Sequence, residues 1–453
     1  MKTLSKNKTA PSHELCRIFT YLISETNGLS LNDTLNLILK NNSSEVSESS
    51  RKEIQQFQKL MNQFIINEIP IQKLLSHPVS EALLKFLNNF PLKYKEEHIH
   101  LTGSLTSEFI YPRLKKLLDG PHKKLYMTKI KEVYGEQALP LRGPEDVDRL
   151  IRLKENEGFD RYLKILYLPK LILVDQKAHE EASYHMAQEL FTTYNVGSIR
   201  LKFSLSRATS SSDEQLPSGD NLSSEEVVLG LYNGFKKFQK THPDFKFILS
   251  PSFRKESNFF NSKLFKTRQE HFHSQVNELV ELIEKYPYLS EHLKDVDTVG
   301  DEKSLYRKEH FNELKSGFRK LRYRGFQIRS HHGETFLTLN RGIQAVDNAM
   351  NIWQIDSLEH GISLGINPNR YFHEIFLQAQ ALNQKSMAIT EKHTFYQEIQ
   401  DLHWGDSKKI LQKLNSGKKL NEQEQLLFLK AKFHTATEVE HYQHDVLNRL
   451  IQK

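Results

Sequence analysis

Two neighbouring stretches are the most informative about the fold. They are DTVGDEKSLYRKEHF (297–311) and RGFQIRSHHGETF (324–336). Short apolar runs of the kind that form buried strands lie at 296–299 and 326–330. The first run leads directly into a GDE triplet and the second into an HHGE tetrad. Glycine and titratable residues at the carboxyl ends of strands are typical of sites built at one edge of a parallel sheet.

Similar apolar runs occur earlier in the chain, at 98–101, 198–203 and 245–249. Helical stretches separate them, and 342–353 is an example in which Ile343, Val346, Met350 and Trp353 share one side. Strand and helix alternating over this length predict βα units and a parallel sheet, which is an α/β fold.

The two ends of the chain have a different texture. Apolar residues between Phe57 and Ile65 recur at helical spacing, so 1–90 is predicted to be an N-terminal helical extension. Residues 208–224 are rich in serine and acidic residues and predict an exposed loop. From about residue 401 the chain reads as charged helices without a strand. We therefore expect a barrel-like domain at 91–400 and a helical tail at 401–453.

Composition restricts the class of protein. Among the 453 residues, Lys and Arg exceed Asp and Glu by 63 to 56, and the excess is spread over pairs such as Lys115-Lys116 and Lys236-Lys237. A solvated surface is expected, without a strong nucleic-acid signal. No run approaches the roughly 18 apolar residues of a membrane span, so no membrane partner is expected. The single cysteine, Cys16, forms no internal disulfide, and the cytoplasm is the expected compartment.

Histidines at two further places complete the pattern. In EHIHLTGS (97–104), His98 and His100 are two positions apart on a predicted strand and point to the same face. Two imidazoles at that spacing can bind one metal ion. In LEHG (358–361), His360 precedes a glycine. A histidine at a strand end is more often a hydrogen-bonded packing residue than a ligand, but the order of these motifs changes the interpretation.

H-x-H, then GDE, then H-x-G-E, then H-G resembles the adenosine/AMP deaminase family of metal-dependent hydrolases over roughly residues 90–370. The resemblance implies a TIM-type (β/α)8 barrel and Zn²⁺ as cofactor. It matches His98, His100 and His331 to the zinc-binding histidines. It matches Glu334 to the carboxylate that protonates the purine ring, and His360 to the histidine that orients the attacking water. His100, Thr102 and Gly300 are expected to contact the substrate, a purine nucleoside or nucleotide.

The sequence departs from the family at Thr102, where the family usually has an acidic residue that contacts the ribose. A threonine hydroxyl can donate to a 5′-phosphate that a carboxylate would repel, so a nucleotide substrate is expected to be tolerated. His331 is the expected ligand rather than His332, because it keeps the family's spacing to Glu334. His332 stands where the family has a small residue and is expected to narrow the pocket.

A second departure is the lack of the Asp-Asp motif that ends the family's last strand, since no Asp-Asp pair occurs in the chain. Asp401 and Asp406 are the nearby acids, in a context that does not match. The barrel is therefore expected to be incomplete at its last strands. Three alternatives stay open: a truncated open barrel, a non-catalytic barrel that binds a ligand or protein, or a metal shell completed by another residue or a second subunit.

Two further features have competing interpretations. Arg254 follows another predicted strand, and packing or an ion pair explains it as well as substrate contact does. In the tail, His434, His441 and His444 with Asp445 form a possible cluster, although scattered histidines on a solvated helix are the simpler interpretation. The oligomeric state is not predicted. Deamination of nucleic acid is disfavoured because the C-x-x-C zinc pattern of the nucleic-acid deaminases is absent.

Overall fold

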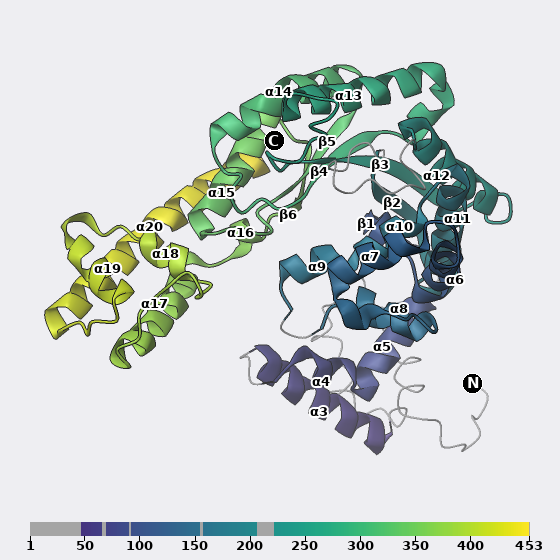
Figure 1. Ribbon diagram of the computed structural model, residues 1–453. Helices are drawn as coiled ribbons and strands as arrows, with labels where there is room; N and C mark the ends of the chain where they lie inside the picture. Colours follow the sequence, from purple (N-terminus) through teal and green to yellow (C-terminus); the bar gives the residue numbers. More distant parts are fainter. Residues whose placement is uncertain (1–46, 66–68, 90–91, 155–156, 206–221, 453) are drawn as a thin grey trace. The chain divides into compact units, whose positions relative to one another are not determined.

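A computed structural model describes residues 47–65, 69–89, 92–154, 157–205 and 222–452 (Figure 1). Cys16 and most of the expected serine-rich loop lie outside these ranges. The chain divides into two compact units. The smaller comprises residues 1–96, 187–198 and 243–246, and the larger comprises 97–186, 199–242 and 247–453. The domain boundaries expected at residues 90 and 400 stay a prediction.

Six strands form one sheet whose spatial order follows the sequence, β1-β2-β3-β4-β5-β6. From β3 to β6 each neighbouring pair is parallel, with Asp297 beside Ser252 and His331 beside Glu359. The strands are Tyr94–His100, Val196–Ser204, Lys246–Arg254, Asp295–Val299, Gln327–His332 and Ser357–His360. Sequential parallel strands joined by helices are the arrangement of a TIM-type barrel. The predicted α/β barrel that is incomplete at its last strands is confirmed.

Helices follow the strands in alternation. The stretch between β1 and β2 contains α6 Ser107–Leu118, α7 Lys123–Tyr134, α8 Pro144–Ile151, α9 Phe159–Ile165, α10 Tyr167–Ile172 and α11 Gln176–Thr193. The later connections are α12 Ser224–Gln239, α13 Arg268–Lys285, α14 Lys308–Tyr323 and α15 Leu339–Asn348. Helices α13 and α14 lie side by side along the sheet (Figure 1). Phe272 and Phe318 from these helices pack with Phe253 of β3, which buries the outer face of the sheet.

The smaller unit contains the predicted N-terminal helices. They are α3 Glu48–Ile65, α4 Ile71–Leu75 and α5 Pro78–Asn88. Ile54 and Phe57 of α3 are buried, as are Val79 and Ala82 of α5, because apolar residues at helical spacing place their side chains on one face. The ring of His77 lies 5.3 Å from that of Phe57 and caps the first turn of α5.

After β6 the chain forms helices where a closed barrel would have two more strands. They are α16 Ile362–Gly365, α17 Pro368–Gln384, α18 Tyr396–Gln400, α19 Lys408–Asn415 and α20 Glu422–Ile451 (Figure 1). A capping box formed by Asn421 and Glu424 begins α20. This helix packs on α15 and α17, and the Gln443 side chain donates to the carbonyls of Ser363 and Ile366 at 2.8 Å each. Within the described residues, the sheet therefore ends at β6.

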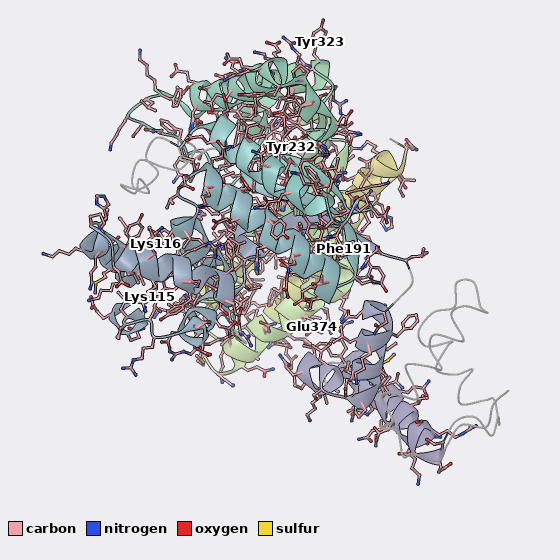
Figure 2. All side chains as sticks on the ribbon, turned by 90° about the vertical axis from the view of Figure 1, so that its right-hand side faces the viewer. Lys115, Lys116, Phe191, Tyr232, Tyr323 and Glu374 are labelled. Carbon is pink, nitrogen blue, oxygen red and sulfur yellow. The ribbon has the colours of Figure 1, made fainter. Side chains whose placement is uncertain are left out.

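The lysine pairs of the sequence lie on the surface, as predicted. Lys115 and Lys116 are exposed on α6 (Figure 2), and Lys236 with Lys237 is exposed on α12. Among the described residues, no helix has the length and apolar character needed to cross a membrane.

Candidate active site

Every predicted site residue faces one cavity of about 220 Å³ at the carboxyl ends of the strands. The strands are parallel, so residues that follow them meet at the same edge of the sheet even when they are far apart in sequence. Leucines and aromatic residues of α9 and α10 form much of the wall. The predicted residues among the lining are His98, His100, Thr102, Gly300, His331, Glu334 and His360.

The three histidines predicted as ligands converge on one point. The Nε2 atoms of His98 and His100 are 3.1 Å apart, those of His100 and His331 are 3.2 Å apart, and those of His331 and His98 are 3.0 Å apart. His98 and His100 come from β1, where alternate residues share a face. His331 comes from β5. The sheet thus assembles a three-nitrogen cradle from two strands that are distant in the sheet order.

Buried carboxylates fix the orientation of two of these rings. Glu359 lies 2.6 Å from Nδ1 of His98, and Asp297 lies 2.9 Å from Nδ1 of His331. When Nδ1 donates to the carboxylate, the lone pair of Nε2 is directed into the cavity, as in metal-binding histidines. Burial lowers the pKa of His331 to about 4, although Asp297 opposes this shift. Burial and the neighbouring His331 lower the pKa of His100 to about 3, so both rings are neutral at pH 7.

Lys202 of β2 balances the two carboxylates and was not predicted. Its Nζ lies 3.2 Å from Asp297 and 2.9 Å from Glu359, and its side chain is fully buried. Arg329 also contacts Glu359, at 2.6 Å. Burial alone would raise the pKa of Glu359, but the hydrogen bond with His98 and the charge of Lys202 outweigh it and lower that pKa. A signal for Lys202 was present in the sequence, because charged residues occur at alternate positions inside otherwise apolar strands.

The cradle fits a zinc ion. Two nitrogens bound to one tetrahedral zinc, each at about 2.05 Å, lie about 3.3 Å apart, close to the separations between these Nε2 atoms. Three imidazoles are a donor set that zinc accepts, with a fourth position left for water or substrate. Within the described residues, the potential ligands at this point are His98, His100 and His331, and no carboxylate joins them as a fourth ligand. Asp401 instead pairs with Arg341 at 2.6 Å, and neither Asp401 nor Asp406 lines the cavity.

Glu334 and His360 face each other beside the cradle. Their closest atoms, Oε2 and Nε2, are 3.7 Å apart. The His360 ring centroid lies 4.7 Å from that of His98 and 5.0 Å from that of His331. Burial lowers the pKa of His360, against the opposing charge of Glu334. His360 has φ +72°, a left-handed conformation that costs a non-glycine residue about 1–3 kcal/mol and recurs at active sites.

Glu302, the last residue of the GDE triplet, holds the loop that carries Glu334. Its buried carboxylate accepts from the backbone N–H groups of Gly333 at 3.1 Å, Glu334 at 2.6 Å and Thr335 at 2.8 Å. Lys255 lies 3.6 Å from the same carboxylate and also donates to the carbonyl of His331. The triplet was recognised in the sequence, but this role depends on the pairing of β4 with β5 and was not foreseen.

Gly300, Thr102 and Arg254 also line the cavity. Gly300 has φ +111°, and a Cβ there would collide with the carboxylate of Glu256. The positive φ favours glycine at this position, and any other residue would also displace the Glu256 carboxylate. Glu256 also pairs with Arg254, whose guanidinium lies over the Phe259 ring at 4.4 Å. Arg254 has an ion-pair partner and a place in the cavity wall, so the structure accommodates both interpretations of it.

The expectation that His332 narrows the pocket is wrong. His332 is fully buried, its Nδ1 lies 2.6 Å from the hydroxyl oxygen of Ser330, and its ring contacts those of Phe311 and Trp353. Adjacent residues on a strand point to opposite faces. Since His331 points into the cavity, His332 points into the core behind it.

The fold and the cavity together define an incomplete α/β barrel with a three-histidine cradle at the carboxyl ends of its strands. The solved structures that are similar to it include the following two. One is the apo structure of the N6-methyl-AMP deaminase from Arabidopsis thaliana, with a TM-score of 0.40, and the other is a complex of ADAL with IMP, with a TM-score of 0.41. Each is 14% identical over 61% of this chain, and the chain spans 66% of the length of each. No protein-family model matches the sequence, and no curated protein matches it.

Proposed function

We propose that this protein is a metal-dependent aminohydrolase that acts on an adenosine-type purine nucleoside or nucleotide. One water is consumed, the bond from purine C6 to its amino nitrogen breaks, a C6 carbonyl forms and ammonia leaves. The convergence of the three Nε2 atoms of His98, His100 and His331 beside Glu334 and His360 carries this proposal. Imidazole nitrogens that converge on one point, next to two groups that can move protons, suit hydrolysis.

Zn²⁺ is the cofactor that we assign to the cradle, where it would make water nucleophilic at neutral pH. The remaining steps belong to side chains. Glu334 takes a proton from the attacking water and gives it to the purine ring nitrogen, which makes C6 more electrophilic. His360 orients the attacking water and stabilises the negative charge that develops on its oxygen. Asp297 and Glu359 keep His331 and His98 in the tautomer that the cradle requires.

We further propose that the site accepts a 5′-phosphate. Thr102, Lys170 and Arg254 line the same cavity and contribute a hydroxyl and two cations. A hydroxyl and cations favour a phosphate, whereas the acidic residue that the resemblance places at position 102 would repel one. The apolar wall, which includes Leu166 and Phe259, offers a surface for the flat purine ring.

The test is ammonia release from adenosine and from AMP by the full-length protein supplied with Zn²⁺. Glu334→Gln and His360→Asn should each lower kcat/KM by about 10²- to 10⁴-fold, the usual contribution of a general acid or base. Glu391→Gln is the matched control, because Glu391 is an exposed carboxylate that does not line the cavity. Its activity should equal that of the unmodified protein.

The outcomes separate the competing functions. Release from AMP but not adenosine supports the phosphate assignment, and release from adenosine alone contradicts it. Zinc and purine binding by calorimetry without ammonia release would establish a non-catalytic binding protein in place of the enzyme. Full activity in Glu334→Gln would refute the role given to that carboxylate.

A further inference from the structure

A second cluster of metal-binding side chains lies in the helical tail, outside the cavity. It consists of His403, in the turn after α18, and His434 and Glu438 on α20. Nδ1 of His403 is 3.2 Å from Oε2 of Glu438, and Nε2 of His434 is 3.6 Å from Oε1 of the same residue. The three potential donor atoms lie within 4.8 Å of one another.

Helix geometry places two of these side chains together. His434 and Glu438 are four residues apart on α20, a spacing that puts side chains on the same face one turn apart. His434, His441 and His444 are all exposed on α20, as the simpler interpretation predicted, and within the described residues the possible cluster of these three histidines does not form. His434 instead faces the chain segment after α18, and its ring centroid lies 4.1 Å from that of His403.

His403, the third residue of the cluster, is fixed in place by a backbone hydrogen bond and by the packing of the next residue. The N–H of His403 donates to the Thr435 hydroxyl at 2.8 Å, which fixes the turn to α20 beside His434. Trp404 follows, with 6% of its surface exposed, and stacks on Phe428 with ring centroids 5.5 Å apart. Its indole N–H donates to the carbonyl of Ile399 at 2.9 Å. The scaffold under the cluster is therefore packed and hydrogen-bonded, so it holds the backbone of His403 beside that of His434.

We propose that His403, His434 and Glu438 bind one divalent transition-metal ion of the Zn²⁺ and Ni²⁺ class. Two imidazoles and one carboxylate are ligands that these ions accept, with the remaining positions filled by water. About half of each side chain is exposed, so the ion has open access from solvent. The bound ion links the turn at 401–407 to α20 and stabilises the folded tail, because binding favours the folded state by mass action.

The experiment is calorimetric titration of the full-length protein with Ni²⁺. His434→Ala should bind one ion fewer than the unmodified protein, so any ion at the barrel cradle cancels in the comparison. His441→Ala is the matched control, since His441 is an exposed histidine on the same helix outside the cluster. It should keep the full stoichiometry. Glu438→Gln should weaken the same site by more than about tenfold, the lower end of the loss seen when even an outer partner of a metal ligand is removed.

Thermal unfolding gives an independent readout. Added Ni²⁺ should raise the Tm of the unmodified protein and of His441→Ala by more than that of His434→Ala. Equal stoichiometry in His434→Ala and the unmodified protein would overturn the proposal, as would an equal loss in His441→Ala. His434 is half exposed, so its replacement by alanine leaves the buried packing of α20 intact.

Discussion

At the scale of the residue, the candidate site depends on a balance of buried charges behind its histidines. Asp297 and Glu359 orient two imidazoles, and Lys202 neutralises both carboxylates from a fully buried position. A charge in such a place is tolerated only while its partners remain. The orientation of the histidines therefore depends on Lys202, although only the histidines form a recognisable sequence motif.

Lys202→Met should lower the free energy of unfolding by about 3–5 kcal/mol, because it leaves two buried carboxylates without their shared cation. Urea unfolding of the full-length protein measures the change. Lys115→Met is the matched control, since Lys115 is an exposed lysine on α6 (Figure 2), and should change stability by less than about 0.5 kcal/mol. Equal midpoints for Lys202→Met and Lys115→Met would contradict the charge-balance account.

At the scale of the element, two loops at the carboxyl edge act as one unit because Glu302 connects them. It follows β4, yet it accepts hydrogen bonds from three consecutive backbone N–H groups that follow β5. The loop that carries Glu334 therefore takes its conformation from a carboxylate on the neighbouring strand connection.

Glu302→Ala should reduce stability by more than about 2 kcal/mol, because it leaves buried N–H groups without an acceptor. Glu302→Gln keeps an acceptor oxygen and should lose less stability than the alanine variant. The two proteins are compared by urea unfolding and by purine turnover. Equal stability of the Glu302→Ala and Glu302→Gln proteins would show that this side chain does not hold the loop in place.

Glu398 forms a second connection between elements, and its titration is expected to make stability depend on pH. Glu398 of α18 has 3% of its surface exposed and accepts from the N–H of Leu339 at 2.5 Å and from the Tyr371 hydroxyl at 2.9 Å. Burial raises its pKa from 4.5 to about 7. A carboxyl group whose pKa is higher in the folded state favours folding fully below pH 4.5, and this contribution is lost as the pH rises through 7.

Glu398→Gln mimics the neutral form and should be more stable than the unmodified protein at pH 8, by up to about 3 kcal/mol. The difference should shrink toward zero as the pH falls to 4.5. Urea unfolding of both proteins between pH 4.5 and 8 measures it. A difference that does not change with pH would show that Glu398 does not titrate in this range.

At the scale of the whole molecule, sequence reasoning identified the residues that lie at strand ends. H-x-H, GDE, HHGE and EHG each lie at or directly after the carboxyl end of a strand, and parallel strands bring such residues to one edge whatever their separation in sequence. The resemblance selected His331 rather than His332 by its spacing to Glu334, and His331 is the one that lines the cavity. The absence of an Asp-Asp pair also predicted that the barrel would be incomplete.

Interactions between strands were beyond the reach of the sequence. Nothing local indicates that Lys202 meets Glu359, because that contact joins β2 to β6. The grouping of His403 with His434, which is 31 residues later in the chain, likewise depends on how a turn packs against α20. Periodicity describes the face of one element, whereas partners across elements depend on tertiary packing.

The metal content of the purified full-length protein shows whether the three histidines of the cradle bind zinc. Elemental mass spectrometry after growth in zinc-replete medium is applied to a His434→Ala protein, so that only the barrel cradle is counted. We predict about one zinc per chain, retained in the further variant His360→Ala and lost in His331→Ala, since three imidazoles can hold a catalytic zinc and two are a poorer set. Zinc near zero in the parent, or equal zinc with and without His331, would contradict the account.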